Sequence, residues 1–309
     1  MKAKMFNQTH IEGALYQHDL TLKVTGENSK NPGTEFISGT IEIATDDAGI
    51  NIVPVHFTYV TATTSKGSAN ATFNVLKNII DGVYKTVMID GAEKATMLRV
   101  DSAIGLNEFY DRNDQFVSVK RNEGGFVHVT PTIAEDERTR NTFDCDIIIN
   151  NVTHIEGDEE KGTTDKAVVK GVIFNFRNDV MPVEFSAINP KAMDYFEGLG
   201  ASNSNPIFTR IKGRQISESI VRRVEEESAF GEPSIKEYKS TKKDFVITWA
   251  MPEPYMWDDD STITARELTE ALAAREVTLA EIKRRNDEYK ASQGKTPVNA
   301  APAPGVFNF

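Results

Sequence analysis

Basic and aromatic side chains recur on or beside the segments of this sequence that alternate like β-strands. Such a mixture suits an unpaired polynucleotide, because aromatic rings stack on bases for about 1–3 kcal/mol each and cations follow the phosphates. The strongest group is Arg210, Lys212 and Arg214, because alternate residues of a strand lie on one face. A phenylalanine in a strand, taken singly, is more often a core residue. The candidate binding residues are Lys23, His56, Phe57, Tyr59, Lys66, Arg99, Lys120, Arg121, Phe174, Phe176, Arg177, Arg210, Lys212 and Arg214.

Motifs of catalysis, cofactor binding and metal binding do not occur in the sequence. It has no Walker loop, no His-Glu-x-x-His or Cys-x-x-Cys spacing and no nucleophile elbow. The five histidines are scattered, and Gly198-Leu199-Gly200 follows a predicted helix instead of opening one. Asp258-Asp259-Asp260 precedes another predicted helix, where a carboxylate is more simply a cap than a cation ligand. We therefore expect no enzyme activity, no cofactor and no metal site.

Charge and composition limit the kind of binding site that the chain can have. The formal net charge is −11, which opposes attraction to a polyanion, so a phosphate-binding site has to be a local groove. The single cysteine, Cys145, excludes an intramolecular disulfide. No apolar run reaches the roughly 18 residues of a membrane-spanning helix, and the polar N-terminal segment resembles no signal peptide. These features predict a cytoplasmic protein that does not enter membranes.

The two halves of the chain share one order of predicted elements, in which strands are followed by a short helix and then by more strands. In the first half, alternation predicts strands at 20–24, 36–44, 52–60, 97–103, 116–120 and 126–129. In the second half it predicts strands at 143–149, 168–176, 181–186, 207–212 and 245–249.

Helical signals occur in four places. A short helix begins near Phe73 and ends at Gly82, and a second is capped by Asn189 and ends at Gly198. Residues 214–228 read as a charged helix, because Ile216, Ile220 and Val224 form one stripe at helical spacing. Residues 264–292 form a long charged helix, for which Ser261 or Thr262 is the expected cap.

The last segment of the sequence, 294–309, is rich in proline and alanine. It cannot bury enough apolar surface to fold, so we expect a disordered tail. Phe307 and Phe309 nevertheless place two aromatic rings on it. Three interpretations remain open for this pair: a harmless end, docking on a partner protein, or docking into the protein's own binding groove.

The first part of the chain resembles bacterial-type single-stranded DNA-binding proteins with an OB-fold. The likeness lies in IEGAL at 11–15, LTLKV at 20–24, FISGTIEIA at 36–44 and VPVHF at 53–57. A helix between the third and fourth strands, predicted in both halves, is also the OB arrangement. The chain also resembles the tandem OB-type replication proteins of tailed bacteriophages. In that family a flexible tail with an aromatic tip recruits replication partners, but the tip here, Phe307-Asn308-Phe309, lacks the adjacent acidic residues.

Together these observations predict a mainly β protein with short helices (α+β). Its expected parts are two OB-like barrels in tandem at 1–138 and 139–257, a charged helix at 258–293 and the tail at 294–309. The resemblance implies sequence-nonspecific binding of single-stranded DNA in phage replication or recombination, in the host cytoplasm, with replication proteins as further partners. Self-association into a homo-oligomer is compatible with the sequence. The alternative is a viral structural or assembly protein whose helical arm is exchanged between subunits.

Overall fold

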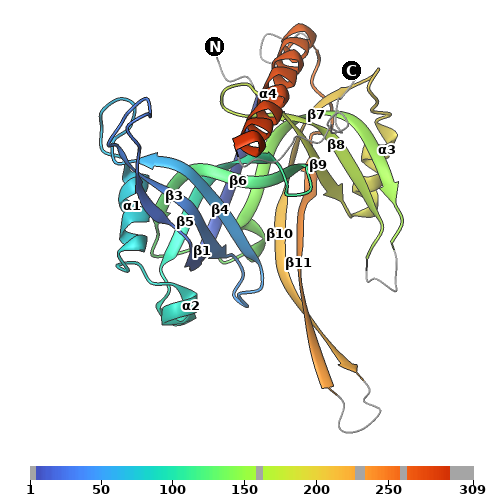
Figure 1. Cartoon of the computed structure of the whole chain (residues 1–309). Helices are drawn as coiled ribbons and strands as arrows, with labels where there is room; N and C mark the ends of the chain where they lie inside the picture. The colour runs from blue at the N-terminus through green and yellow to red at the C-terminus, as the bar shows by residue number, and fades with distance from the viewer. Residues whose placement is uncertain (1–4, 158–162, 227–233, 258–262, 293–309) are drawn as a thin grey trace.

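The computed structural model describes residues 5–157, 163–226, 234–257 and 263–292, and it is mainly β. The strands join edge to edge into one sheet of 11 strands, in the order β10-β11-β9-β8-β7-β1-β5-β6-β4-β3-β2. Figure 1 shows this sheet folded into two barrels, with the long helix α4 lying over their junction. The predicted class, mainly β with few helices and a C-terminal helix, is confirmed.

The first barrel is closed by five consecutive pairings. β1 pairs antiparallel with β3 and β5, β3 with β4, and β5 with β6, and β4 then meets β6 in parallel at Val55↔Asn122. β2 continues along β3 where β1 leaves it, so β1 and β2 act as one bent first strand. A five-stranded Greek-key barrel of this kind is the OB-fold. Its elements are β1 (Asn7–His18), β2 (Thr21–Val24), β3 (Glu35–Ala44), β4 (Ile52–Thr61), α1 (Ala71–Ile80), α2 (Val87–Asp90), the 3-10 helix η1 (Ala92–Lys94), β5 (Met97–Tyr110) and β6 (Phe116–Val129).

The second barrel repeats these pairings strand for strand. β7 pairs with β8 and β10, β8 with β9, and β10 with β11, all antiparallel, and a parallel contact at Val246↔Ser186 closes the ring. The helix again lies between the third and fourth strands. The elements, after the 3-10 helix η2 (Glu137–Thr139), are β7 (Asn141–Ile155), β8 (Lys166–Phe174), β9 (Val180–Ala187), α3 (Pro190–Gly198), β10 (Ile207–Glu226) and β11 (Ser234–Ala250).

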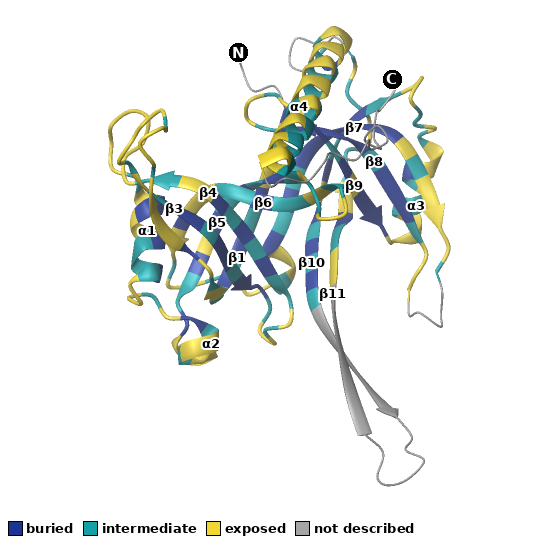
Figure 2. Ribbon diagram, in the orientation of Figure 1, coloured by how far each residue is buried: buried dark blue, intermediate teal, exposed yellow. Residues whose placement is uncertain are grey.

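Alternating apolar residues fill each barrel, and a short helix covers one end of it. Figure 2 shows the buried positions along the strands of both barrels. From α1, Leu76 is fully buried in the first core, and from α3, Phe196 is 1% exposed in the second. The expected Asn189 cap is present, since its side chain accepts from the Lys191 N–H, and in α1 the Asn70 side chain accepts from the Thr72 N–H. Both short helices predicted from the sequence are therefore confirmed.

The predicted helix at 214–228 is wrong, because these residues belong mostly to strand β10. Ile216, Ile220 and Val224 are four residues apart, and this spacing fits one face of a strand as well as one face of a helix. The pairing partner, β11, begins at Ser234, so it is much longer than the strand predicted at 245–249. The two strands predicted at 116–120 and 126–129 are likewise one strand, β6.

The barrels are joined by their first strands. β1 and β7 pair antiparallel from Asn7↔Cys145 to Ile11↔Asn141, which makes the sheet continuous from one barrel to the other. A buried amide pair supports this joint, because Asn122 of β6 and Gln215 of β10 donate to each other at 2.7 and 2.9 Å. The hairpin formed by the fourth and fifth strands of each barrel, β5–β6 or β10–β11, thus contacts the other barrel.

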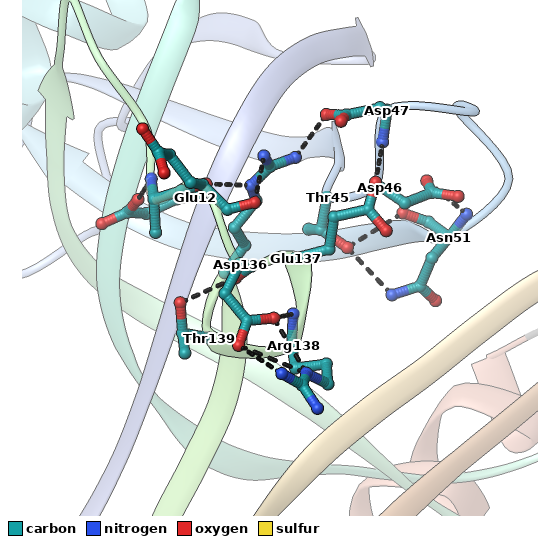
Figure 3. Close-up of polar contacts among 12 residues, drawn as sticks. Glu12, Thr45, Asp46, Asp47, Asn51, Asp136, Glu137, Arg138 and Thr139 are labelled. Carbon is teal, nitrogen blue, oxygen red and sulfur yellow. Dashed lines mark hydrogen bonds and ion pairs between the residues drawn. The ribbon is translucent and has the colours of Figure 1, made fainter.

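The segment between the barrels is held to the turn between β3 and β4 (Figure 3). The Asp47 N–H donates to the Glu137 carboxylate at 2.6 Å, and the buried Arg140 guanidinium donates to the Asp47 carboxylate at 2.6 Å. Within η2, the Asp136 carboxylate accepts from the Arg138 N–H and side chain. These contacts fix how the chain enters β7.

Helix α4 (Ala265–Ser292) binds both barrels. It opens with a capping box in which Thr264 and Glu267 each accept a hydrogen bond from the backbone N–H of the other, so Thr264 caps the helix. The expected cap residues, Ser261 and Thr262, lie outside the described residues. Leu268 is buried beside strands of the second barrel, while Arg275 pairs with Glu108 of β5 and Lys290 with Asp114 after β5. The expected helix at the C-terminal end of the body is confirmed, seated on its own barrels.

Replacing Asn122 by alanine is expected to lower the free energy of unfolding by about 1–3 kcal/mol, because buried Gln215 loses its partner. Gln215→Ala should cost a similar amount, and the double variant should cost less than the sum, since both substitutions remove the same bonds. Urea denaturation of the three variants and the parent protein measures this coupling. Asn74→Ala, at an exposed position of α1, is the control. Strict additivity would contradict a joint held by this pair.

Candidate nucleic-acid interface

A groove of about 820 Å³ runs between the two barrels and α4. One wall is the outer face of β8 and β9, the second and third strands of the second barrel. The opposite wall is the β5–β6 hairpin of the first barrel, and α4 contributes Arg275 and Leu279. In OB-folds the face of strands 2 and 3 is the one that receives oligonucleotides and oligosaccharides. We call this hollow the inter-barrel groove.

The inter-barrel groove gathers positive charge in an acidic protein. Five cationic side chains line it, against three carboxylates, in a chain whose net charge is −11. Because the field in a cleft depends on the charges nearest to it, this local excess can attract a polyanion. The cations are Lys120, Lys166, Lys170, Lys243 and Arg275, and the carboxylates are Glu108, Glu184 and Asp244.

Two of these lysines form partly exposed ion pairs that contribute little free energy. Lys170 lies 2.9 Å from Glu184, its register partner across β8 and β9, and Lys166 lies 3.7 Å from Asp244. Both lysines are about one third exposed, and ion pairs of this kind contribute at most about 1 kcal/mol, so a phosphate can displace the carboxylate. Lys243 is exposed and has no ion pair among the described residues. Arg275 and Glu108, by contrast, are a part-buried pair, with side chains only 11% and 10% exposed, that anchors α4.

Lys120, a predicted phosphate ligand, joins the barrels instead. Its Nζ lies 4.4 Å from the ring centroids of both Phe185 and Phe245, and it donates to the Glu184 carbonyl oxygen. Burial lowers the pKa of Lys120 to about 8, and nearby Asp244 opposes that shift. Its ammonium group is therefore occupied by the second barrel. Lys120 therefore holds the β5–β6 hairpin, which is one wall of the groove, against the second barrel.

The first barrel brings some predicted residues together at the end of its sheet. Lys23 is the register partner of Phe36, whose ring lies 4.7 Å from that of half-exposed Tyr59. His56 lies farther along β4, where its Nδ1 is 3.1 Å from the Thr40 hydroxyl. Burial, and next the Arg121 cation, lower the pKa of His56.

The other predicted cations of this barrel either lie beside a carboxylate or are exposed in a loop. Arg121 pairs with Glu123 at 2.9 Å, and Arg99 lies 3.5 Å from Asp101 on β5. Lys66 is exposed in the loop between β4 and α1.

Two predicted stacking residues belong to the cores. Phe57 is 2% exposed among the apolar side chains of the first barrel, and Phe174 is 1% exposed beneath α4. Neither ring has a face that a base could reach, so we remove both from the predicted binding surface. Phe176 is the opposite case, since it is 81% exposed in the β8–β9 turn with the Arg177 guanidinium 5.1 Å from its ring.

The stripe of Arg210, Lys212 and Arg214 lies on β10 as predicted, but a carboxylate faces part of it. Asp144 of the neighbouring strand β7 lies 2.7 Å from Arg210 and 3.2 Å from Lys212. The Lys212 Nζ also lies 5.3 Å from the ring of Trp249. Arg214 therefore has the most available charge of the three.

Phe307 and Phe309, the predicted partner-binding residues, lie outside the described residues.

Sequence reasoning missed the lysines of β8 and β11 and the indole of Trp249. Lys166 and Lys170 occupy alternating positions with Val168 on one face of β8, which is the same signal that singled out the stripe on β10. Lys243 carries no such signal, because its strand was predicted to begin after it.

The described residues hold no cluster of three or more His, Cys, Asp or Glu side chains that could bind a metal ion. None of the described helices combines the length and apolar character required to cross a membrane.

Comparisons with known proteins find similarity both by sequence and by structure. A family model described as YorF matches residues 6–285. No curated protein matches the chain. A deletion mutant of the single-stranded DNA binding protein from Thermus aquaticus is similar in structure, with 11% identity and a TM-score of 0.46 over 84% of this chain and 98% of that chain. A replication protein A heterotrimer bound to single-stranded DNA is similar with 8% identity and a TM-score of 0.23, over 89% and 69%.

Lys120→Met is expected to change how stability depends on pH. Because the pKa of Lys120 falls from 10.5 in the unfolded chain to about 8 in the folded one, the unfolded chain binds more protons between these values. The parent protein should therefore gain stability relative to the variant as pH rises from 8 toward 10.5, with a constant difference below pH 8. Urea denaturation across this range measures the effect. Lys94→Met, at an exposed site on η1, should keep the parent profile, whereas parallel profiles for parent and Lys120→Met would contradict the buried position.

Proposed function

The chain belongs to the YorF family, and we propose that it binds single-stranded DNA without strong sequence preference and without catalysis. The observation that carries this proposal is the inter-barrel groove, a cation-rich hollow on the strand 2–3 face of an OB barrel. That face is where OB-folds bind oligonucleotides, and the local charge is what a phosphate backbone requires.

Several features of the groove support an unpaired strand rather than a duplex. Four of its five cations are lysines, which act as point charges on phosphates and do not read base edges. Phe116 lines the groove, and a ring of this kind can stack only on an unpaired base. Binding of this type is tolerant of sequence, because every base has a π-face.

The biological setting is the finer part of the proposal. We propose a role in phage DNA replication or recombination in the host cytoplasm, with replication proteins recruited by Phe307 and Phe309. The competing assembly interpretation invokes a helical arm exchanged between subunits. Leu268 and Arg275 seat α4 on its own barrels, so no observation favours that exchange.

The double variant Lys166→Ala/Lys170→Ala tests the proposed function. We expect weaker binding of labelled dT oligonucleotides by fluorescence anisotropy, and a salt slope reduced by about 1.4, which is about 0.7 for each lost contact to a single strand. Lys77→Ala/Lys94→Ala removes the same charge from α1 and η1 and should leave both quantities unchanged. Equal binding by the two double variants, or equal affinity of the parent protein for duplex and single strand, would contradict the proposal.

A further inference from the structure

A second groove of about 820 Å³ lies between helix α3 and the β10–β11 pair. Its floor is apolar, with Val246, Ile247 and Phe196 buried, and its rim includes Ile188, which is 44% exposed. We call it the α3–β11 groove. It is lined by residues of the second barrel alone and lies outside the inter-barrel groove.

Trp249 gives this groove an available aromatic surface. Its side chain is 44% exposed, and it sits on β11 directly opposite Lys212 of β10, whose Nζ is 5.3 Å from the ring. An exposed indole beside a cation suits a nucleotide, whose base can stack on the ring while its phosphate meets the cation.

The cations around the α3–β11 groove outnumber its carboxylates. Among the residues whose side chains the structure describes, Lys191 and Arg214 line it together with a single acidic residue, Glu218. The Nε of Arg214 is buried and has no hydrogen-bond partner among the residues that the structure describes. Hydrogen bonds from Arg138 are the main cause that lowers the pKa of Asp136, and the nearby Arg214 cation is the smallest cause. The Asp136 carboxylate is thus already bonded to Arg138. The Arg214 residue as a whole is of intermediate exposure and has no ion pair among the described residues, so its charge is available to an anionic group in the groove.

The two grooves meet at the parallel seam between β9 and β11. Ser186 lines the inter-barrel groove, and its register partner Val246 lines the α3–β11 groove. Along β11, residues 243–245 belong to the first groove and residues 246–250 to the second. A bound strand can therefore pass from one to the other without leaving the surface of the second barrel.

We propose that single-stranded DNA leaving the inter-barrel groove crosses the β9–β11 seam and enters the α3–β11 groove, where a base stacks on Trp249 and a phosphate pairs with Arg214. This inference rests on the proposed function and extends it to a second, consecutive contact site. The cationic rim and the continuity with a lysine-lined groove favour nucleic acid over an apolar peptide as the occupant.

The test uses Trp249 as its own reporter. The sequence has two tryptophans, and Trp257 packs on Phe208 and donates to the Pro206 carbonyl oxygen, so Trp257→Phe leaves Trp249 as the single indole. In this background, dT oligonucleotides from about 4 to about 32 nucleotides, a range that brackets one and two OB sites, are titrated while anisotropy and tryptophan emission are recorded. Short oligonucleotides should bind without changing the emission, and longer ones should quench it.

Two substitutions complete the experiment. Trp249→Ala should weaken binding of long oligonucleotides by about 5- to 150-fold and leave short ones unaffected, as expected for one lost stacking contact. Arg214→Gln should also weaken long-oligonucleotide binding, while Arg266→Gln, an exposed site on α4, should not. Thermal denaturation of each variant verifies that it is folded.

The outcomes separate the two proposals. If long oligonucleotides bind but Trp249 emission stays constant and Arg214→Gln matches Arg266→Gln, the second contact site is overturned while single-strand binding stands. If no oligonucleotide of any length raises the anisotropy at low salt, single-strand binding itself fails.

Discussion

The backbone pairing of β1 and β7 is the constraint on which the rest of the molecule depends. β1 is a member of the first barrel through β3 and β5, and it also pairs with β7 from Asn7 to Ile11. Because one strand serves both barrels, their relative orientation is set by hydrogen-bond register and not by a flexible linker. The β5–β6 hairpin is thereby placed beside β8 and β9, which creates the inter-barrel groove. Asn122, Gln215 and Lys120 add further contacts between the barrels.

Local patterns in the sequence predict the elements of this fold better than the ways in which they meet. Alternation reveals most strands, while Gly82 and the Asn189 cap mark the short helices, because these signals lie within a few residues of one another. The 214–228 segment fails because a spacing of four residues fits both helix and strand. Only the partner strand β11, which pairs with it residue for residue, decides between them.

The candidate site is harder to predict than the fold, for a physical reason. The inter-barrel groove draws on β6, β8, β9, β11 and α4, which are far apart in the chain, so no local motif records it. The composition does not predict the groove either, because a net charge of −11 for the whole chain gives no sign of a small region with excess positive charge. Aromatic residues are ambiguous for a related reason. Phe174 and Phe176 are two residues apart, yet one is core and the other is exposed, since the strand ends between them.

The β1–β7 ladder also determines how the molecule bears mechanical load. Hydrogen bonds in an antiparallel pair are perpendicular to the strands. A force directed along the strands therefore shears every bond between Asn7 and Ile11 at the same moment, whereas a force across them opens one pair after another. The joint is stiff to sliding and weaker to peeling. Helix α4, bound to both barrels through Leu268 and Arg275, acts as a second tether across the same joint. A pull transmitted through a bound polymer would thus be resisted most strongly in the direction in which the strands run.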